Sequence, residues 1–223
     1  MVAGVRVTND WGTVQIDENY QMILLRARGS VAISSSNNGQ GFLGSLQVAA
    51  TSPLLFFGPN ANHIGVLSRT LSGGVWTYTL WASAATTVSY YVFDEGVPAS
   101  SGRVGLQLFK PNGQLGFDSS NKPLRITSVL QIRNDAMLIP QDFTLPTNGS
   151  FACCLSFVRM SAVMFATQPV SLGARLVDTL RFTNGAAQVW GRPYSVFPMT
   201  IDQAFAPQTT YPPQILVADV SNF

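Results

Sequence analysis

The chain has 223 residues, of which 11% are charged, and its formal net charge at neutral pH is +2. In soluble proteins, roughly a quarter of all residues are usually charged. Here the two types that coat exposed helices, Glu and Lys, occur only at Glu18, Glu95, Lys110 and Lys122. This composition argues against many surface helices, and the singly placed arginines argue against a nucleic-acid-binding surface. A surface this neutral suits either an ordinary β-protein or a chain that is buried in an assembly.

A β-hairpin is predicted over residues 4–17, and residues 105–118 repeat its pattern without a gap. An opening glycine, a turn glycine and a closing aspartate recur at matched positions: Gly4, Gly12 and Asp17 in the first copy, and Gly105, Gly113 and Asp118 in the second. The turn glycines are predicted to need a positive φ. Each aspartate is predicted to accept backbone N–H bonds from the turn that follows it. Their matched place favours this structural role over a carboxylate pair of the glycoside-hydrolase kind.

Short strands are predicted between the two hairpins, over residues 22–33, 41–49, 54–57, 63–69, 75–81 and 87–94. The clearest is Val75 to Trp81, which has a period of two, with Trp76, Tyr78 and Leu80 on one side. No stretch of ten or more residues combines helical periodicity with good caps. The sequence therefore predicts an all-β chain.

The best candidate linker, residues 95–102, falls just before the second hairpin copy. The second half then echoes the first, with long strands predicted over 124–133 and within 151–168. We therefore expect two antiparallel β-sandwich-like modules from an internal duplication, over residues 1–95 and 103–190. Residues 191–223 contain five prolines among aromatics, which predicts either an extended tail over a surface, often that of a neighbouring subunit, or an ordered return over its own domain. Deleting residues 207–223 is then expected to weaken assembly more than the fold of the first module.

No residues with an established pattern for catalysis, metal binding or cofactor binding stand out. His63 is the only histidine and no Gly-x-Ser-x-Gly elbow accompanies it, so a satisfied structural histidine is expected. Cys153 and Cys154 are neighbours, which disfavours an ordinary disulfide and provides no zinc set. The N-terminus has no signal-peptide pattern and the most apolar region, 153–165, is too short to span a bilayer. We therefore expect a chain made in a cytoplasm, without membrane insertion.

Aromatic residues gather on the strands before the linker, and four of them are candidate contacts to a receptor or partner: Trp76, Tyr78, Trp81 and Tyr91. Aromatics at a spacing of two also fill the cores of β-sandwiches, which is the favoured interpretation. Solvent exposure of Trp76 and Trp81 separates the two, because a receptor site needs exposed anchors.

The hairpin formula, followed by a polar turn and a strand such as residues 122–126, resembles one met in small tail proteins of tailed bacteriophages. The resemblance rests on residues 4–25 and 105–126, about a fifth of the chain. The phage proteins that it resembles are virion proteins of the tail tip, baseplate and fibre-attachment region, and they more often contain this sequence pattern once, near the N-terminus. The resemblance implies a non-enzymatic structural protein in a symmetric ring or trimer, with no catalytic residues to carry over.

Together these observations predict a structural component of a phage tail that assembles with copies of itself, as a trimer, and with other tail proteins in the virion. One alternative is a module that binds a glycan or pilus on the host surface. A further alternative is a capsid decoration protein. No cofactor is expected.

Overall fold

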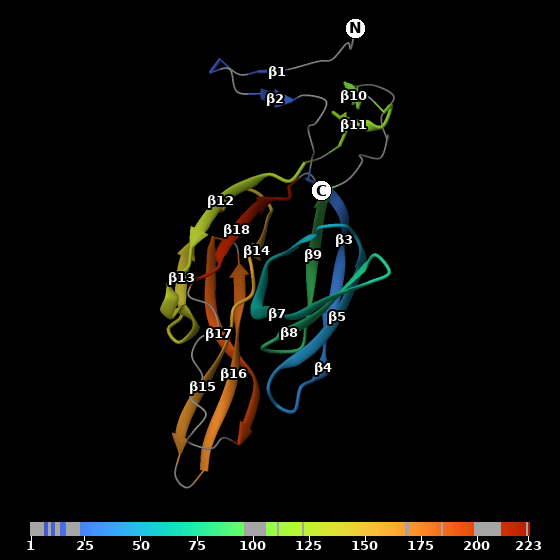
Figure 1. Ribbon diagram of the computed structural model, residues 1–223. Helices are drawn as coiled ribbons and strands as arrows, with labels where there is room; N and C mark the ends of the chain where they lie inside the picture. The colour runs from blue at the N-terminus through green and yellow to red at the C-terminus, as the bar shows by residue number, and fades with distance from the viewer. Residues whose placement is uncertain are drawn as a thin grey trace.

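The structure, a computed structural model, describes residues 7–8, 10–11, 14–16, 23–95, 106–110, 112–121, 123–167, 170–183, 185–198, 211–221 and 223. Eighteen strands and one short 3₁₀ helix lie within these residues (Figure 1). The prediction of an all-β chain is confirmed. Among the described residues, no helix has the length and hydropathy of a membrane span.

Two small hairpins precede the two halves of the body. They are formed by β1 (Val7–Thr8) with β2 (Val14–Ile16), and by β10 (Gln107–Phe109) with β11 (Leu115–Asp118). The first half of the body, residues 23–95, contains β3 (Ile23–Ile33), β4 (Ser35–Ser36), β5 (Phe42–Ala49), β6 (Leu54–Phe57), β7 (Asn60–Ser72), β8 (Val75–Ala82) and β9 (Thr86–Glu95).

The second half of the body, the described residues from 123 to 223, contains two long strands of 14 and 13 residues and several shorter ones. Its elements are β12 (Ile126–Gln131), the 3₁₀ helix η1 (Asn134–Met137), β13 (Gln141–Thr144), β14 (Phe151–Leu155), β15 (Met160–Thr167), β16 (Val170–Thr183), β17 (Ala186–Pro198) and β18 (Gln214–Asp219).

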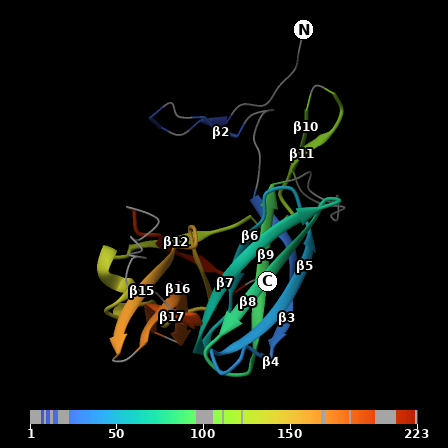
Figure 2. The same cartoon turned by 60° about the horizontal axis from the view of Figure 1, so that its bottom comes forward.

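Two sheets run through both halves of the body. The six-stranded sheet has the order β12-β18-β14-β6-β9-β3, and the eight-stranded sheet has the order β13-β17-β16-β7-β8-β5-β4, with β15 added beside β16. The halves meet where β6 pairs with β14 and where β7 pairs with β16, both antiparallel. Outward from these junctions, each half repeats the same order of strands. Figure 2 shows the two halves side by side.

This arrangement refines the expected domain organisation. Two modules were expected to be divided near residues 95–102, whereas both sheets continue from one half into the other. Residues 96–102 lie outside the described residues. Internal duplication stays a prediction, and the repeated order of strands is what a duplication would leave behind.

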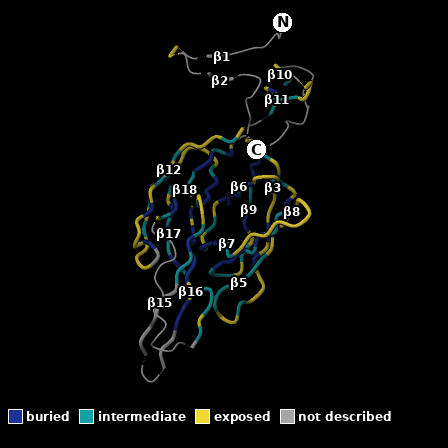
Figure 3. The backbone as a smooth tube through the Cα atoms, in the orientation of Figure 1, coloured by how far each residue is buried: buried dark blue, intermediate teal, exposed yellow. Residues whose placement is uncertain are grey.

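Each half has its own hydrophobic core between the two sheets. The first contains Ile33, Leu80 and Val88, and the second contains Val189 and Ile215, all almost completely buried. Figure 3 shows this burial along central strands such as β9 and β16. Burial of such side chains is the main source of stability in a chain with so few charges.

A third core covers the other face of the six-stranded sheet and joins the halves. It contains Phe56 of β6, Phe93 of β9 and Cys154 of β14. The ring of Phe93 lies edge-on to Phe56 and to the C-terminal Phe223, with centroids 5.5 and 5.4 Å apart. Strands β6 and β14 are therefore buried on both faces, which explains why their sequences are apolar without alternation.

The expected extended tail over 191–223 is wrong in its described parts, which return over the body of the same chain, the other alternative that the sequence left open. Residues 191–198 continue β17, and β18 lies between β12 and β14, with Ile215 and Val217 fully buried. Proline removes a ladder N–H, but β17 tolerates Pro193 and Pro198 because, among the described strands, it pairs beyond Val189 only with β16. The prolines before β18 leave its own apolar run intact.

Candidate functional site

The hairpin β10–β11 is the part of the described chain that carries the sequence resemblance. Its turn closes through two backbone bonds, from Gly113 N–H to Lys110 O at 2.8 Å and from Lys110 N–H to Gln114 O at 2.7 Å. Gly113 has a φ of +81°, the conformation that the turn predicts for it. The Asn112 side chain adds an oxygen that accepts the Gln114 N–H at 3.0 Å. The turn is therefore fixed by local contacts alone.

Asp118 ties the base of the same hairpin to the turn that follows. Its carboxylate accepts the Ser120 N–H at 2.8 Å, the Ser120 hydroxyl, and the Gln107 side-chain amide at 2.8 Å. These bonds, those of Ser120 first, lower the pKa of Asp118. The aspartate thus has the backbone-accepting geometry that its place after the strand predicts.

The two hairpins have the same register. Val7 pairs with Ile16 and Thr8 with Val14, as Leu108 pairs with Phe117 and Phe109 with Leu115, and the register shifts at the same step in both. A common register with a common irregularity is the result that the sequence repeat predicts. Gly12 and Asp17 lie outside the described residues.

Apolar side chains of the second hairpin face solvent. Leu106 is 49% exposed and Phe109 is 57% exposed, while Leu108 and Leu115 are half-buried. The hairpin forms its own two-stranded sheet and, among the described residues, it is not bonded into either large sheet. Figure 1 shows both hairpins at one end of the body. We call this end, formed by β1–β2 and β10–β11, the hairpin end, and Leu106 and Phe109 are exposed on it.

All four aromatic candidates lie in the body, on β8 and β9. Tyr78 and Trp81 are 3% and 2% exposed, and the Trp81 indole donates to Gln40 O at 2.6 Å. Trp76 is half-buried, with the Arg69 guanidinium 5.5 Å from its ring. Tyr91 is half-buried and, together with Phe182, lines a pocket of about 240 Å³. They do not form one exposed platform, so the receptor hypothesis loses its main anchors.

His63 is a buried structural residue, as expected for a lone histidine. Its Nδ1 lies 3.0 Å from Thr179 Oγ1 and its Nε2 lies 3.2 Å from Gln188 Oε1, so one residue of β7 contacts both β16 and β17. Burial, and then the positive charges of Arg192 and Arg181, lower the pKa of His63 to about 4. The histidine is therefore uncharged at neutral pH, and it joins the two halves.

The two cysteines are free and buried on opposite faces of β14. Cys153 faces the second-half core and Cys154 faces the third core. Burial raises the pKa of Cys153 to about 12 and raises that of Cys154 further. Both thiols are therefore unreactive in the folded state. Within the described ranges, no three His, Cys, Asp or Glu residues are grouped to hold a metal ion.

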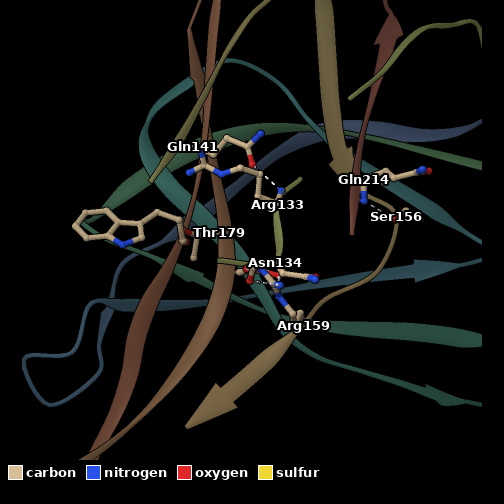
Figure 4. A network of polar contacts seen from close by, with 9 residues as sticks. Arg133, Asn134, Gln141, Ser156, Arg159, Thr179 and Gln214 are labelled. Atoms are coloured by element: carbon tan, nitrogen blue, oxygen red, sulfur yellow. Dashed lines mark hydrogen bonds and ion pairs between the residues drawn. The ribbon is translucent and has the colours of Figure 1, made fainter. Parts of the chain in front are cut away.

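A buried ion pair in the second half was not predicted from the sequence. Arg159 Nε and Nη2 donate to the two oxygens of Asp178 at 2.9 and 3.2 Å, and Nη1 donates to Asn134 O at 2.9 Å. Both side chains are at most 3% exposed. Figure 4 shows Arg159 beside Asn134, at the start of η1. The only indication of this pair in the sequence was Arg159, a charged residue inside the otherwise apolar region 153–165.

The chain was compared with protein families, with curated proteins and with solved structures, and none of the three comparisons finds a match.

Proposed function

We propose that this chain is a non-enzymatic structural component of a tailed-phage virion, at the tail tip, baseplate or fibre-attachment region. It acts by assembling with copies of itself, as a trimer, and with other tail proteins. Threefold symmetry follows from the symmetry of the tail that it would join.

The hairpin end is the observation that carries this proposal. The hairpin formula resembles one found in phage tail proteins, and in β10–β11 it forms a hydrogen-bonded turn with Leu106 and Phe109 exposed. Exposed apolar groups that lie close together on a surface are typical of an assembly contact. A surface with few charges loses little when it is removed from water, which suits the same role.

The chemistry of the body supports a structural role. The lone histidine is engaged with Thr179 and Gln188, and the two thiols are buried in cores. Each of these groups already has a packing or bonding task in the fold. A receptor-binding module is the weaker candidate, because Tyr78 and Trp81 are buried. A capsid decoration protein remains the third candidate and differs from the proposal in location alone.

Immunogold electron microscopy of particles of the phage that encodes the chain tests the proposal. Label at the tail tip, baseplate or fibre attachment is expected, and antibody preadsorbed with the purified chain is the control. Label over the head would favour capsid decoration instead. Intact particles without label, in a preparation where a known tail protein is labelled, would contradict a place in the virion.

A further inference from the structure

We infer that the hairpin end is the contact surface between copies of this chain, and that the hairpins of one copy pack against the hairpins of the next. This inference rests on the self-association in the proposed function and names the surface that performs it.

The first argument comes from how the two halves of the body associate. Corresponding strands of the halves pair directly at both junctions, β6 with β14 and β7 with β16, and the remaining corresponding strands share a sheet. The hairpins β1–β2 and β10–β11 differ, because each stays a separate two-stranded sheet. They are the described counterparts that share no sheet within the chain. A second copy provides the hairpin that each of them lacks.

The second argument is the size of the hairpins. The strands β1, β2, β10 and β11 have two to four residues each. An isolated two-stranded hairpin is marginal in water, and three or more strands or a packed face are needed for stability. The common register of the two hairpins means that their edges offer the same spacing of backbone groups. Adding the hairpin of another copy provides both further strands and a packed face.

The third argument is the apolar surface of β10–β11. Phe109 near the turn and Leu106 near the base are both exposed, while Gln107 and Asp118 bond to each other between them. Trp11, in the turn of the first hairpin, is 90% exposed. Large aromatic side chains dominate the binding energy of protein interfaces. Both hairpins therefore present an aromatic residue at the same end of the molecule.

Two other exposed apolar residues allow the surface to be tested. Val129 is 49% exposed on β12, an edge strand without charged residues that offers a competing contact. Leu71 is 54% exposed near the tip of the β7–β8 hairpin in the first half. Leu71→Asp introduces the same charge as Phe109→Asp at a similarly exposed site, so it is the matched control.

Sedimentation velocity of the full chain and of the variants Phe109→Asp, Val129→Asp and Leu71→Asp gives the dissociation constant of self-association. We expect Phe109→Asp to raise it about tenfold or more, with no change for the other two. Leu106→Ser, a milder change on the same hairpin, should weaken association in the same direction. The thermal transition of the body should be the same in all variants, because the hairpin lies outside its cores.

The inference is overturned if Val129→Asp weakens association and Phe109→Asp does not, or if all variants associate like the parent chain. A parent chain that stays monomeric at micromolar concentration also overturns it. None of these three results depends on where the chain is found in a particle, so the immunogold experiment can succeed while this inference fails.

Discussion

Leu124 donates its backbone N–H to the carbonyl oxygen of Ile23 at 2.8 Å, where the second half of the body begins beside the first. An antiparallel bridge between Leu24 and Pro123 adjoins this bond. Ile23 and Leu124 are 101 positions apart, the spacing that also separates the two hairpin copies. Residues at equivalent positions of the sequence repeat therefore face each other here. The sequence repeat and the order of strands in the two halves are what an internal duplication would produce, and that duplication stays a prediction.

Gly113 should be intolerant of a β-branched residue because its φ is +81°. Nothing lies within 4 Å of an added Cβ, so the cost of Gly113→Val is backbone strain rather than a clash. We expect the hairpin to lose about 1–3 kcal/mol. Amide exchange at Lys110 and Gly113, whose N–H groups close the turn, should become faster.

The control for this change is Gly113→Asn, because Asn tolerates a positive φ better than Val does. Its amide exchange should lie close to that of the parent chain. Equal exchange in the parent and the Val variant would show that the turn does not depend on the glycine.

His63 should make the stability of the protein depend on pH. Its pKa is about 4 in the folded state against a usual 6.5, so the unfolded chain binds the proton first as the pH falls. The contribution of uncharged His63 to the free energy of unfolding is therefore fully present above pH 6.5, and it is lost as the pH falls from 6.5 towards 4. The loss should be roughly 2 kcal/mol, which is less than the full shift implies because solvent moderates it.

Urea unfolding at several pH values measures this effect. The variant His63→Gln keeps hydrogen-bonding groups but does not titrate, so its free energy of unfolding should change less across this pH range. If the variant keeps the slope of the parent chain, the pH dependence comes from another group.

Arg159→Met should be strongly destabilising because it leaves the Asp178 carboxylate buried without a partner. We expect a loss of about 3–5 kcal/mol in the free energy of unfolding. The matched control is Arg133→Met, which breaks a pair with Asp135 in which both side chains are about half exposed. That change should cost about 0–1 kcal/mol. Chemical denaturation of both variants measures the two losses in the free energy of unfolding. Equal losses would contradict the prediction that only the buried pair matters strongly for stability.

Deleting residues 207–223 should unfold the second half, an effect beyond the weakened assembly that the sequence predicted. The deletion removes β18, whose residues Ile215 and Val217 are fully buried between β12 and β14. It also removes Phe223 from the third core. Far-UV circular dichroism and amide exchange should show loss of β-structure. A shortened chain that keeps a cooperative thermal transition at the parent temperature would contradict the role of β18.

Strands with a local signal were predictable from the sequence. The alternation from Val75 to Trp81 became β8, with Tyr78 and Leu80 in the first core. The apolar run 54–57 became β6 with the same bounds. In both cases the pattern lies within the strand itself, because side chains alternate or are uniformly buried.

Features that depend on distant parts of the chain were not predictable. β18 was hidden by its proline-rich neighbourhood, and its place is set by β12 and β14, which lie far before it in the sequence. The pairing of Arg159 with Asp178 depends on the register between β15 and β16. The exposed Leu106 and Phe109 belong to a pattern that usually predicts burial. Only the three-dimensional arrangement shows that no part of the described body covers them.

The claim that this chain works by assembly is tested most directly by its mass in solution. Multi-angle light scattering of the purified full-length chain, over a range of micromolar concentrations, gives that mass without reference to shape. A trimer has three times the chain mass of 24.0 kDa, and the account predicts this species at the higher concentrations. A constant mass of one chain at every concentration, also in the presence of tail-tip partners, would contradict it.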